Sequence, residues 1–125
     1  MLKILLAGPD KNNLSALEPT LGKHEDIEST RTESGKTALE LAGKTSFDLI
    51  VADENLGDMT GLEFAGKLLL INPMINCAIV SSLSQEEFHK ASEGLGLIGR
   101  IPPQPGEKNS EELIKKLRSI KGMLN

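Results

Sequence analysis

The chain has 125 residues, of which 38% are hydrophobic and 26% charged, the composition of a soluble globular protein with one core. Its 18 acidic residues outnumber 14 scattered Lys and Arg residues, and this balance argues against a nucleic-acid-binding surface. The single cysteine excludes a disulfide framework, and the absence of Tyr and Trp removes the usual platforms for stacking bases or flavins. No apolar run is long enough for a membrane span or a signal peptide, so we expect a cytoplasmic location and no membrane contact.

The first half of the chain alternates between strand-like and helix-like patterns. An apolar run at residues 4–7 predicts a strand buried on both faces. A helix follows, with Asp10 or Asn12 as its cap and Gly22 at its end, because leucines recur at three- and four-residue spacing: Leu14, Leu17 and Leu21.

Three further elements complete this half. Residues 27–31 form a weaker strand pattern, and residues 35–43 form a short helix that is closed by a glycine. Residues 49–52 are apolar and β-branched, which predicts a buried strand that runs into a polar turn.

The second half repeats the alternation. Thr60 with Glu63 is the signature of a capping box and starts a helix that the Asn-Pro pair at 72–73 stops. Residues 77–80 predict another buried strand, and Ser84 with Glu87 predicts a second capping box, with a helix ending near residue 94. A last strand is expected at 97–101, and Asn109 with Glu112 is expected to cap the final amphipathic helix, whose apolar positions are Leu113, Ile114, Leu117 and Ile120.

Five strands alternating with five helices predict an α/β fold: a three-layer, flavodoxin-like, doubly wound (βα)5 domain with a five-stranded parallel sheet over residues 1–125. In such folds, functional residues lie at the carboxyl ends of the strands. This rule selects four short segments for a site: residues 8–10, 53–55, 81–82 and 101–102.

The middle of the chain resembles the receiver domain of the bacterial two-component response regulators, including the chemotaxis regulators. Residues 47–53, then Asn55, then residues 59–63 are similar to the strand, loop and helix start that carry the phospho-acceptor in that family. Supporting similarities cover most of the chain: Gly35, Ala38 and Leu39, residues 79–82, and Gly94 eight residues before Pro102.

The resemblance implies roles for three residues. Asp53 matches the aspartate that accepts a phosphoryl group from a histidine kinase, and the backbone carbonyl of Asn55 matches a ligand of Mg²⁺. Ser81 matches the hydroxyl that contacts the phosphoryl group. Bringing a carboxylate to a phosphoryl group requires positive charge, which Mg²⁺ and a lysine supply in this family.

The sequence departs from the family at each place that supplies this charge. Gly8 and Pro9 stand where the family carries an acidic pair, so Mg²⁺ is left with Asp53, Asn55 and Asp10, and we expect a weak or absent Mg²⁺ site.

The fifth strand departs from the family as well. Ile101 replaces the family's lysine, and Ile98 replaces its aromatic switch residue. Arg100 is expected to point to the opposite face of the strand, which makes it a poor substitute for the lysine. The resemblance implies a cis bond between Ile101 and Pro102, whereas a trans bond is the ordinary expectation for a loop.

We interpret the chain as a pseudo-receiver without enzymatic activity, which acts by contact with a histidine kinase or another signalling protein. By the resemblance, the partner surface is the fourth helix, fifth strand and fifth helix, roughly residues 84–120, and a homodimer forms through the same face. A conventional regulator phosphorylated on Asp53 is one competing hypothesis. Another is a small flavodoxin-like protein that binds a nucleotide or cofactor, although Pro9 removes an amide that a phosphate-binding loop would use.

Overall fold

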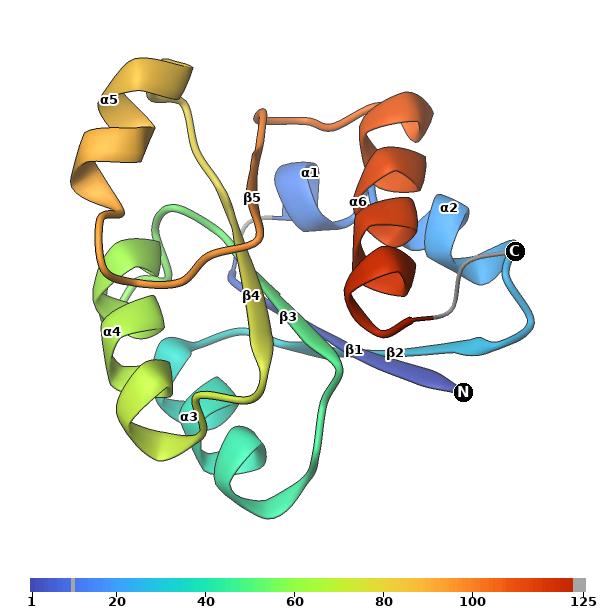
Figure 1. The fold of residues 1–125 in the computed structure, drawn as a ribbon, viewed down its shortest axis with the longest axis horizontal. Helices are drawn as coiled ribbons and strands as arrows, with labels where there is room; N and C mark the ends of the chain where they lie inside the picture. Colours follow the sequence, from blue (N-terminus) through green and yellow to red (C-terminus); the bar gives the residue numbers. More distant parts are fainter. Residues whose placement is uncertain (10, 123–125) are drawn as a thin grey trace.

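The sheet has five parallel strands in the order β2-β1-β3-β4-β5, so the predicted α/β fold with a flavodoxin-like topology is confirmed (Figure 1). The computed structural model describes residues 1–9 and 11–122. The expected Mg²⁺ ligand and cap Asp10 lies outside what it describes, and so does the side chain of the other expected cap, Asn12. The strand bounds are β1 Leu2–Ala7, β2 Ile27–Thr32, β3 Leu49–Ala52, β4 Asn76–Val80 and β5 Gly99–Ile101.

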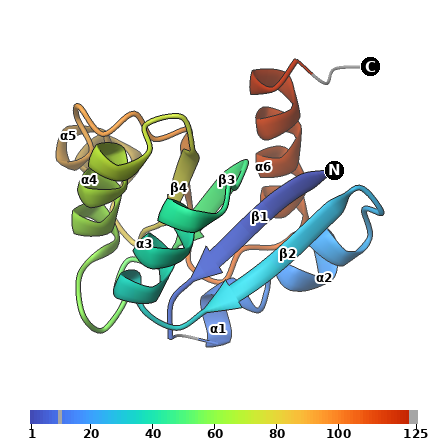
Figure 2. The same ribbon diagram turned by 90° about the horizontal axis from the view of Figure 1, so that it is seen from below.

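Helices cover both faces of the sheet, as Figure 2 shows. Their bounds are α1 Lys11–Leu14, α2 Glu18–Gly22, α3 Gly35–Lys44, α4 Gly61–Ile71, α5 Gln85–Ala91 and α6 Glu107–Ile120. One apolar cluster joins the sheet to α3, α4 and α5, and a second joins it to α1, α2 and α6. The three-layer arrangement follows from these two clusters.

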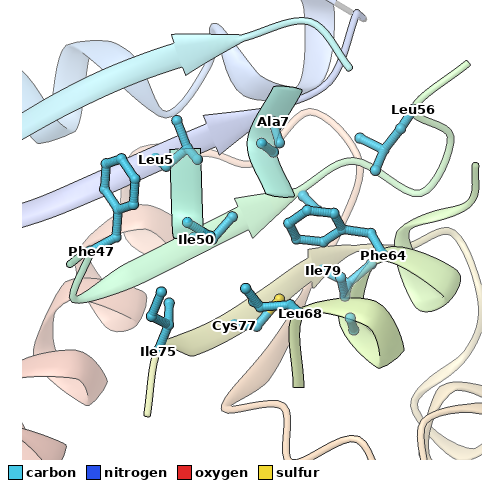
Figure 3. Packing of buried hydrophobic residues seen from close by; sticks show 14 of the residues in the cluster. Leu5, Ala7, Phe47, Ile50, Leu56, Phe64, Leu68, Ile75, Cys77 and Ile79 are labelled. Atoms are coloured by element: carbon cyan, nitrogen blue, oxygen red, sulfur yellow. The ribbon is translucent and has the colours of Figure 1, made fainter. Parts of the chain in front are cut away.

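Successive residues of the central strands contribute to opposite clusters. Leu5 and Ile50 face the α4 side and belong to the same cluster as Phe47 and Phe64 (Figure 3), whereas Leu6 and Val51 face the α6 side. All four residues of β3 are buried, as expected for a strand of a parallel sheet that is covered on both sides. The central strands can therefore present polar groups to a ligand mainly at their ends.

The first predicted helix is wrong in one respect, because it is interrupted. It consists of α1 and α2, with Pro19 in the first turn of α2. A proline inside a continuous helix would lack the N–H for the ladder and would clash with the carbonyl four residues earlier. The leucine spacing survives the interruption, since Leu14, Leu17 and Leu21 are all buried.

The ends of later elements also differ from the expectations. The capping boxes of Thr60 with Glu63 and of Ser84 with Glu87 are confirmed. The helix α6, however, begins at Glu107 rather than after Asn109, because the Asn109 side chain accepts a hydrogen bond from the N–H of Gly106 at 3.1 Å. Strand β5 is shorter than predicted, α5 ends at Ala91, and the described residues contain no cis peptide bond, so the bond before Pro102 is trans.

Candidate functional site

Asp53 stands at the carboxyl end of β3 and is almost fully buried, with 2% of its surface exposed. Its N–H donates to the carbonyl of Ala7 at 2.9 Å, which fixes its backbone against β1. The hydrogen bonds of its carboxylate include two to Oδ1, from the N–H of Glu54 at 2.8 Å and from Nδ2 of Asn13 at 3.1 Å. The strand therefore presents a carboxylate whose Oδ1 is held by two donors of the chain, a side-chain amide and a backbone N–H.

Asn13 is a buried partner of Asp53 that the motif reasoning missed. Its Nδ2 donates to Asp53, and its Oδ1 accepts from the N–H of Gln104, in the loop before α6, at 2.9 Å. A signal for it does exist in the sequence. Asn13 lies four residues before Leu17, which places a polar amide on the apolar face of the predicted first helix.

Gly8 is required at the position where the resemblance expects an acid. Its φ of +152° is one that residues with side chains rarely adopt, and a Cβ there would lie 2.8 Å from Cβ of Asp53 and 3.1 Å from Cδ1 of Leu14. Gly61 has a similar role on the other side, because a Cβ there would lie 2.5 Å from the carbonyl oxygen of Asp53. The backbone thus closes around Asp53 so tightly that residue 8 has no room for a carboxylate side chain.

Glu54 joins two of the loops at this edge of the sheet. Its Oε2 accepts from the N–H of Ser82 at 2.7 Å and from the Ser82 hydroxyl at 3.0 Å, and its carbonyl accepts from the N–H of Gly61 at 3.0 Å. The β3–α4 loop is therefore tied to the β4–α5 loop. The sequence does not single out Glu54 for this role, because a contact between two loops leaves no pattern in a single sequence.

Ser81 is buried at the end of β4, and its hydroxyl accepts from the N–H of Leu83 at 3.1 Å. Its carbonyl accepts from Nη1 of Arg100 at 2.9 Å. Arg100 also lines the pockets between α5 and α6 with Gln85 and Lys116, whereas the Asp53 pocket has other lining residues. Its cation therefore holds the end of β4 and does not replace a lysine beside Asp53.

Asn55 is exposed in the β3–α4 loop, where its Oδ1 accepts from the N–H of Gly57 at 2.9 Å. Further along this loop, Asp58 accepts from the N–H groups of Lys36 and Gly35 at 2.9 Å and 3.0 Å, and these bonds lower the pKa of Asp58. The loop is thereby attached to the start of α3 and is held at both ends.

An open pocket of about 340 Å³ lies over Asp53. Its lining residues are Pro9, Asn13, Asp53, Glu54, Asn55 and Gly57. The structure thus brings Asp53 and Asn55 to one pocket, as the resemblance implies, while Ser81 lies at the end of the neighbouring strand. Ile101 is 3% exposed and is packed in the apolar cluster on the α6 side, so it contributes no polar group here.

Comparison with known proteins shows to which family the chain belongs. The family model of the response regulator receiver domain matches residues 4–117. The chain belongs to this family. A receiver domain takes part in two-component signalling, so the phospho-acceptor and Mg²⁺ positions expected from the resemblance are the ones to test.

The chain is similar to several known proteins. A protein-glutamate methylesterase/protein-glutamine glutaminase 2 of Methanospirillum hungatei is 27% identical over 122 residues and matches 93% of the chain, and the chain spans only 35% of its length. A redox sensor of the streptococci, described as evolved from response regulators, is 25% identical with a TM-score of 0.81, covering 98% of this chain and 54% of the sensor.

Solved structures at lower identity support the fold. A CheY-like receiver domain protein of Methanospirillum hungatei has a TM-score of 0.83 at 23% identity over 98% of each chain. The chemotaxis response regulator CheY4 of Vibrio cholerae has a TM-score of 0.82 at 20% identity, covering 94% of this chain and 98% of that one.

Receiver domains typically bind Mg²⁺ in an acidic pocket, but the described residues of this one do not fit the ion. No group of three or more His, Cys, Asp or Glu side chains among them is arranged to hold a metal. Oδ1 of Asp53 already accepts two hydrogen bonds, and Gly8 and Pro9 offer no side-chain ligand.

Two further expectations can be compared with these findings. Within the described part of the receiver domain, no helix has both the length and the apolar character needed to cross a membrane.

The alternative of a flavodoxin-like cofactor-binding protein is not favoured, because the receiver family accounts for residues 4–117.

Proposed function

We propose that this receiver domain is a pseudo-receiver, which signals through protein contacts without efficient phosphorylation of Asp53. The observation that carries the proposal is the close packing of Gly8 against Asp53. Any larger residue at position 8 would place its Cβ only 2.8 Å from Cβ of Asp53. Two supports of phosphoryl transfer are thereby missing, because Gly8 cannot carry a metal-binding acid and Ile101 cannot carry a positive charge.

Phosphoryl transfer to Asp53 would also need positive charge to be supplied at the positions where Gly8, Pro9 and Ile101 stand. Transfer of a phosphoryl group to a carboxylate brings anions together, and catalysis consists mainly of positioning and neutralising that charge. Around Asp53 the identified donors to Oδ1 are a neutral amide group and a backbone N–H, from Asn13 and Glu54. The nearby carboxylate of Glu54 adds negative charge to the pocket rather than compensating for it.

The proposed partner surface is the face formed by α5, β5 and α6, within residues 84–120. Two adjoining pockets of about 240 Å³ and 420 Å³ lie there, and they share Gln85, Gly99, Arg100 and Lys116. Such a surface combines cationic groups with half-buried apolar ones, including Leu97 and Ile98. A histidine kinase, another signalling protein or a second copy of the chain would bind there, and no enzymatic activity is proposed.

Incubation with a small-molecule phosphodonor and Mg²⁺, followed by intact-mass and peptide mass spectrometry, tests this proposal. We expect little or no phosphorylated protein, whereas a conventional receiver domain treated in parallel should be labelled substantially. Asp53→Asn is the matched control, because it removes the acceptor carboxylate and keeps the size of the side chain. Stoichiometric labelling of the wild-type chain that disappears in the Asp53→Asn variant would refute the pseudo-receiver proposal.

A further inference from the structure

One side chain connects Asp53 to a distant part of the sequence. Asn13 donates through Nδ2 to Oδ1 of Asp53 at 3.1 Å and accepts through Oδ1 from the N–H of Gln104 at 2.9 Å. It is 8% exposed, so these bonds are largely shielded from water. Helix α1, the end of β3 and the loop before α6 therefore meet at a single amide group.

The chemistry of this contact suits a carboxamide. Oδ1 of Asp53 accepts a hydrogen bond here, and the backbone N–H of Gln104 only donates one. The group between them must donate at one end and accept at the other. Asn13 satisfies both partners in one orientation, and that orientation depends on both.

The backbone of Gln104 explains why this link has mechanical consequences. Its φ is +51°, and it is the one non-glycine residue with a positive φ in the described part of the chain. Residues with side chains adopt this region at a cost, and a residue before a proline, here Pro105, is further biased towards extended conformations. The hydrogen bond from Gln104 to Asn13 holds the loop in this conformation, two residues before the N-cap of α6 at Gly106.

We propose that Asn13 is a coupling residue, which transmits the state of the Asp53 carboxylate to the loop before α6. This coupling deepens the proposed function, because α6 forms part of the proposed partner surface, and it rests on a partner binding at that surface. When the Asp53 carboxylate is removed or engaged by another group, Asn13 loses its acceptor. Its hold on Gln104 weakens, and the loop relaxes.

Hydrogen exchange of individual backbone amides, measured by NMR on the full chain, tests the coupling. The measured quantity is the exchange rate of the Gln104 amide divided by that of amides in β1, so that a general loss of stability cancels. For Asn13→Ala we expect this ratio to rise roughly tenfold or more, since a buried hydrogen-bonded link is lost. For Asp53→Ala we expect a rise of at least about threefold, because the effect must pass through Asn13.

Two further variants distinguish coupling from local damage. Asp53→Asn keeps an oxygen that accepts from Asn13, so the ratio should stay near the wild-type value. Asn76→Ala is the matched control, because Asn76 also bridges two strands through Nδ2, to the carbonyl of Asp48 at 3.1 Å, and lies outside the proposed link. It should leave Gln104 unchanged.

The double variant gives the decisive result. If Asn13 carries the coupling, Asp53→Ala should have no further effect on Gln104 once Asn13 is already alanine. Two results would overturn the proposal. One is an exchange ratio of Gln104 in Asp53→Ala that equals the wild-type ratio. The other is a ratio in the double variant that equals the product of the two single effects. Phosphorylation of Asp53 would refute the pseudo-receiver proposal but leave this coupling standing, so the two ideas fail in separate experiments.

Discussion

Substitution of Gly8 by alanine tests whether the backbone around Asp53 requires glycine. The new Cβ would lie 2.8 Å from Cβ of Asp53 and 3.1 Å from Cδ1 of Leu14, in a residue with a φ of +152°. Two penalties therefore combine: backbone strain and overpacking. Alanine at two other glycines separates the two penalties. At Gly57 (φ +84°) the new Cβ meets no atom within 4 Å, so only backbone strain applies. At Gly43, in α3, neither strain nor overpacking applies.

The expected magnitudes follow from these environments. Strain at a positive φ costs about 1–3 kcal/mol, so we expect that loss of unfolding free energy for Gly57→Ala. Overpacking a buried site costs about 1–3 kcal/mol more, which brings Gly8→Ala to about 2–6 kcal/mol. Gly43→Ala should instead stabilise the chain by up to about 1 kcal/mol, since alanine favours the helix.

Denaturation in urea, followed by far-UV circular dichroism, measures these differences. Fluorescence is unsuited, because the chain has neither Trp nor Tyr. The midpoint shift at constant slope reports the change in the free energy of unfolding. If Gly8→Ala unfolds at the same urea concentration as Gly57→Ala, the close contact with Asp53 has no energetic weight and the argument for the lost acid is wrong.

Three other predictions concern groups outside this contact. Glu54→Ala should lower the free energy of unfolding by about 1–3 kcal/mol, because the hydrogen bonds from Ser82 are lost. Glu54→Gln should lower it by less, because the amide oxygen still accepts from Ser82. Equal losses in urea denaturation would contradict the hydrogen-bond explanation. A hydrogen bond from Arg118 lowers the pKa of Asp26 from 3.8 to about 2, so its contribution to stability is present above pH 4 and lost as the pH falls towards 2. Thermal unfolding of Asp26→Asn should therefore show a weaker pH dependence across that interval than the wild type, and an identical profile would refute the assignment. Burial raises the pKa of the Cys77 thiol to about 12, so a thiol reagent at pH 8 should label it only at the rate of unfolding, and rapid labelling of the folded chain would show that the strand is accessible.

The elements were predictable wherever a local pattern determines them. Residues 49–52 match β3 at both ends, because a short apolar run between polar turns has few alternative structures. Both capping boxes form because each depends on residues only three positions apart. Pro19 shows why apolar spacing alone is not enough to predict a helix. The leucine spacing continues past Pro19, but a continuous helix cannot, because proline lacks the backbone N–H.

The candidate site was predictable only in part. Asp53 and Asn55 could be placed because the fold rule selects the carboxyl end of β3 and the resemblance names the positions there. Asn13 and Glu54 could not be placed in the same way, because their partners, Gln104 and Ser82, lie 91 and 28 residues away in the sequence. Contacts between loops depend on the assembled sheet, which a pattern read along one chain does not contain.

The close approach of Gly8 to Asp53 also has an evolutionary consequence. A mutation that restores an acid at residue 8 would first impose strain and a collision with Asp53, before any ligand for a metal was gained. The cost falls on the fold itself, whatever residues 9 and 101 are. Fold stability therefore opposes any such substitution at residue 8 unless the backbone around Asp53 first moves apart.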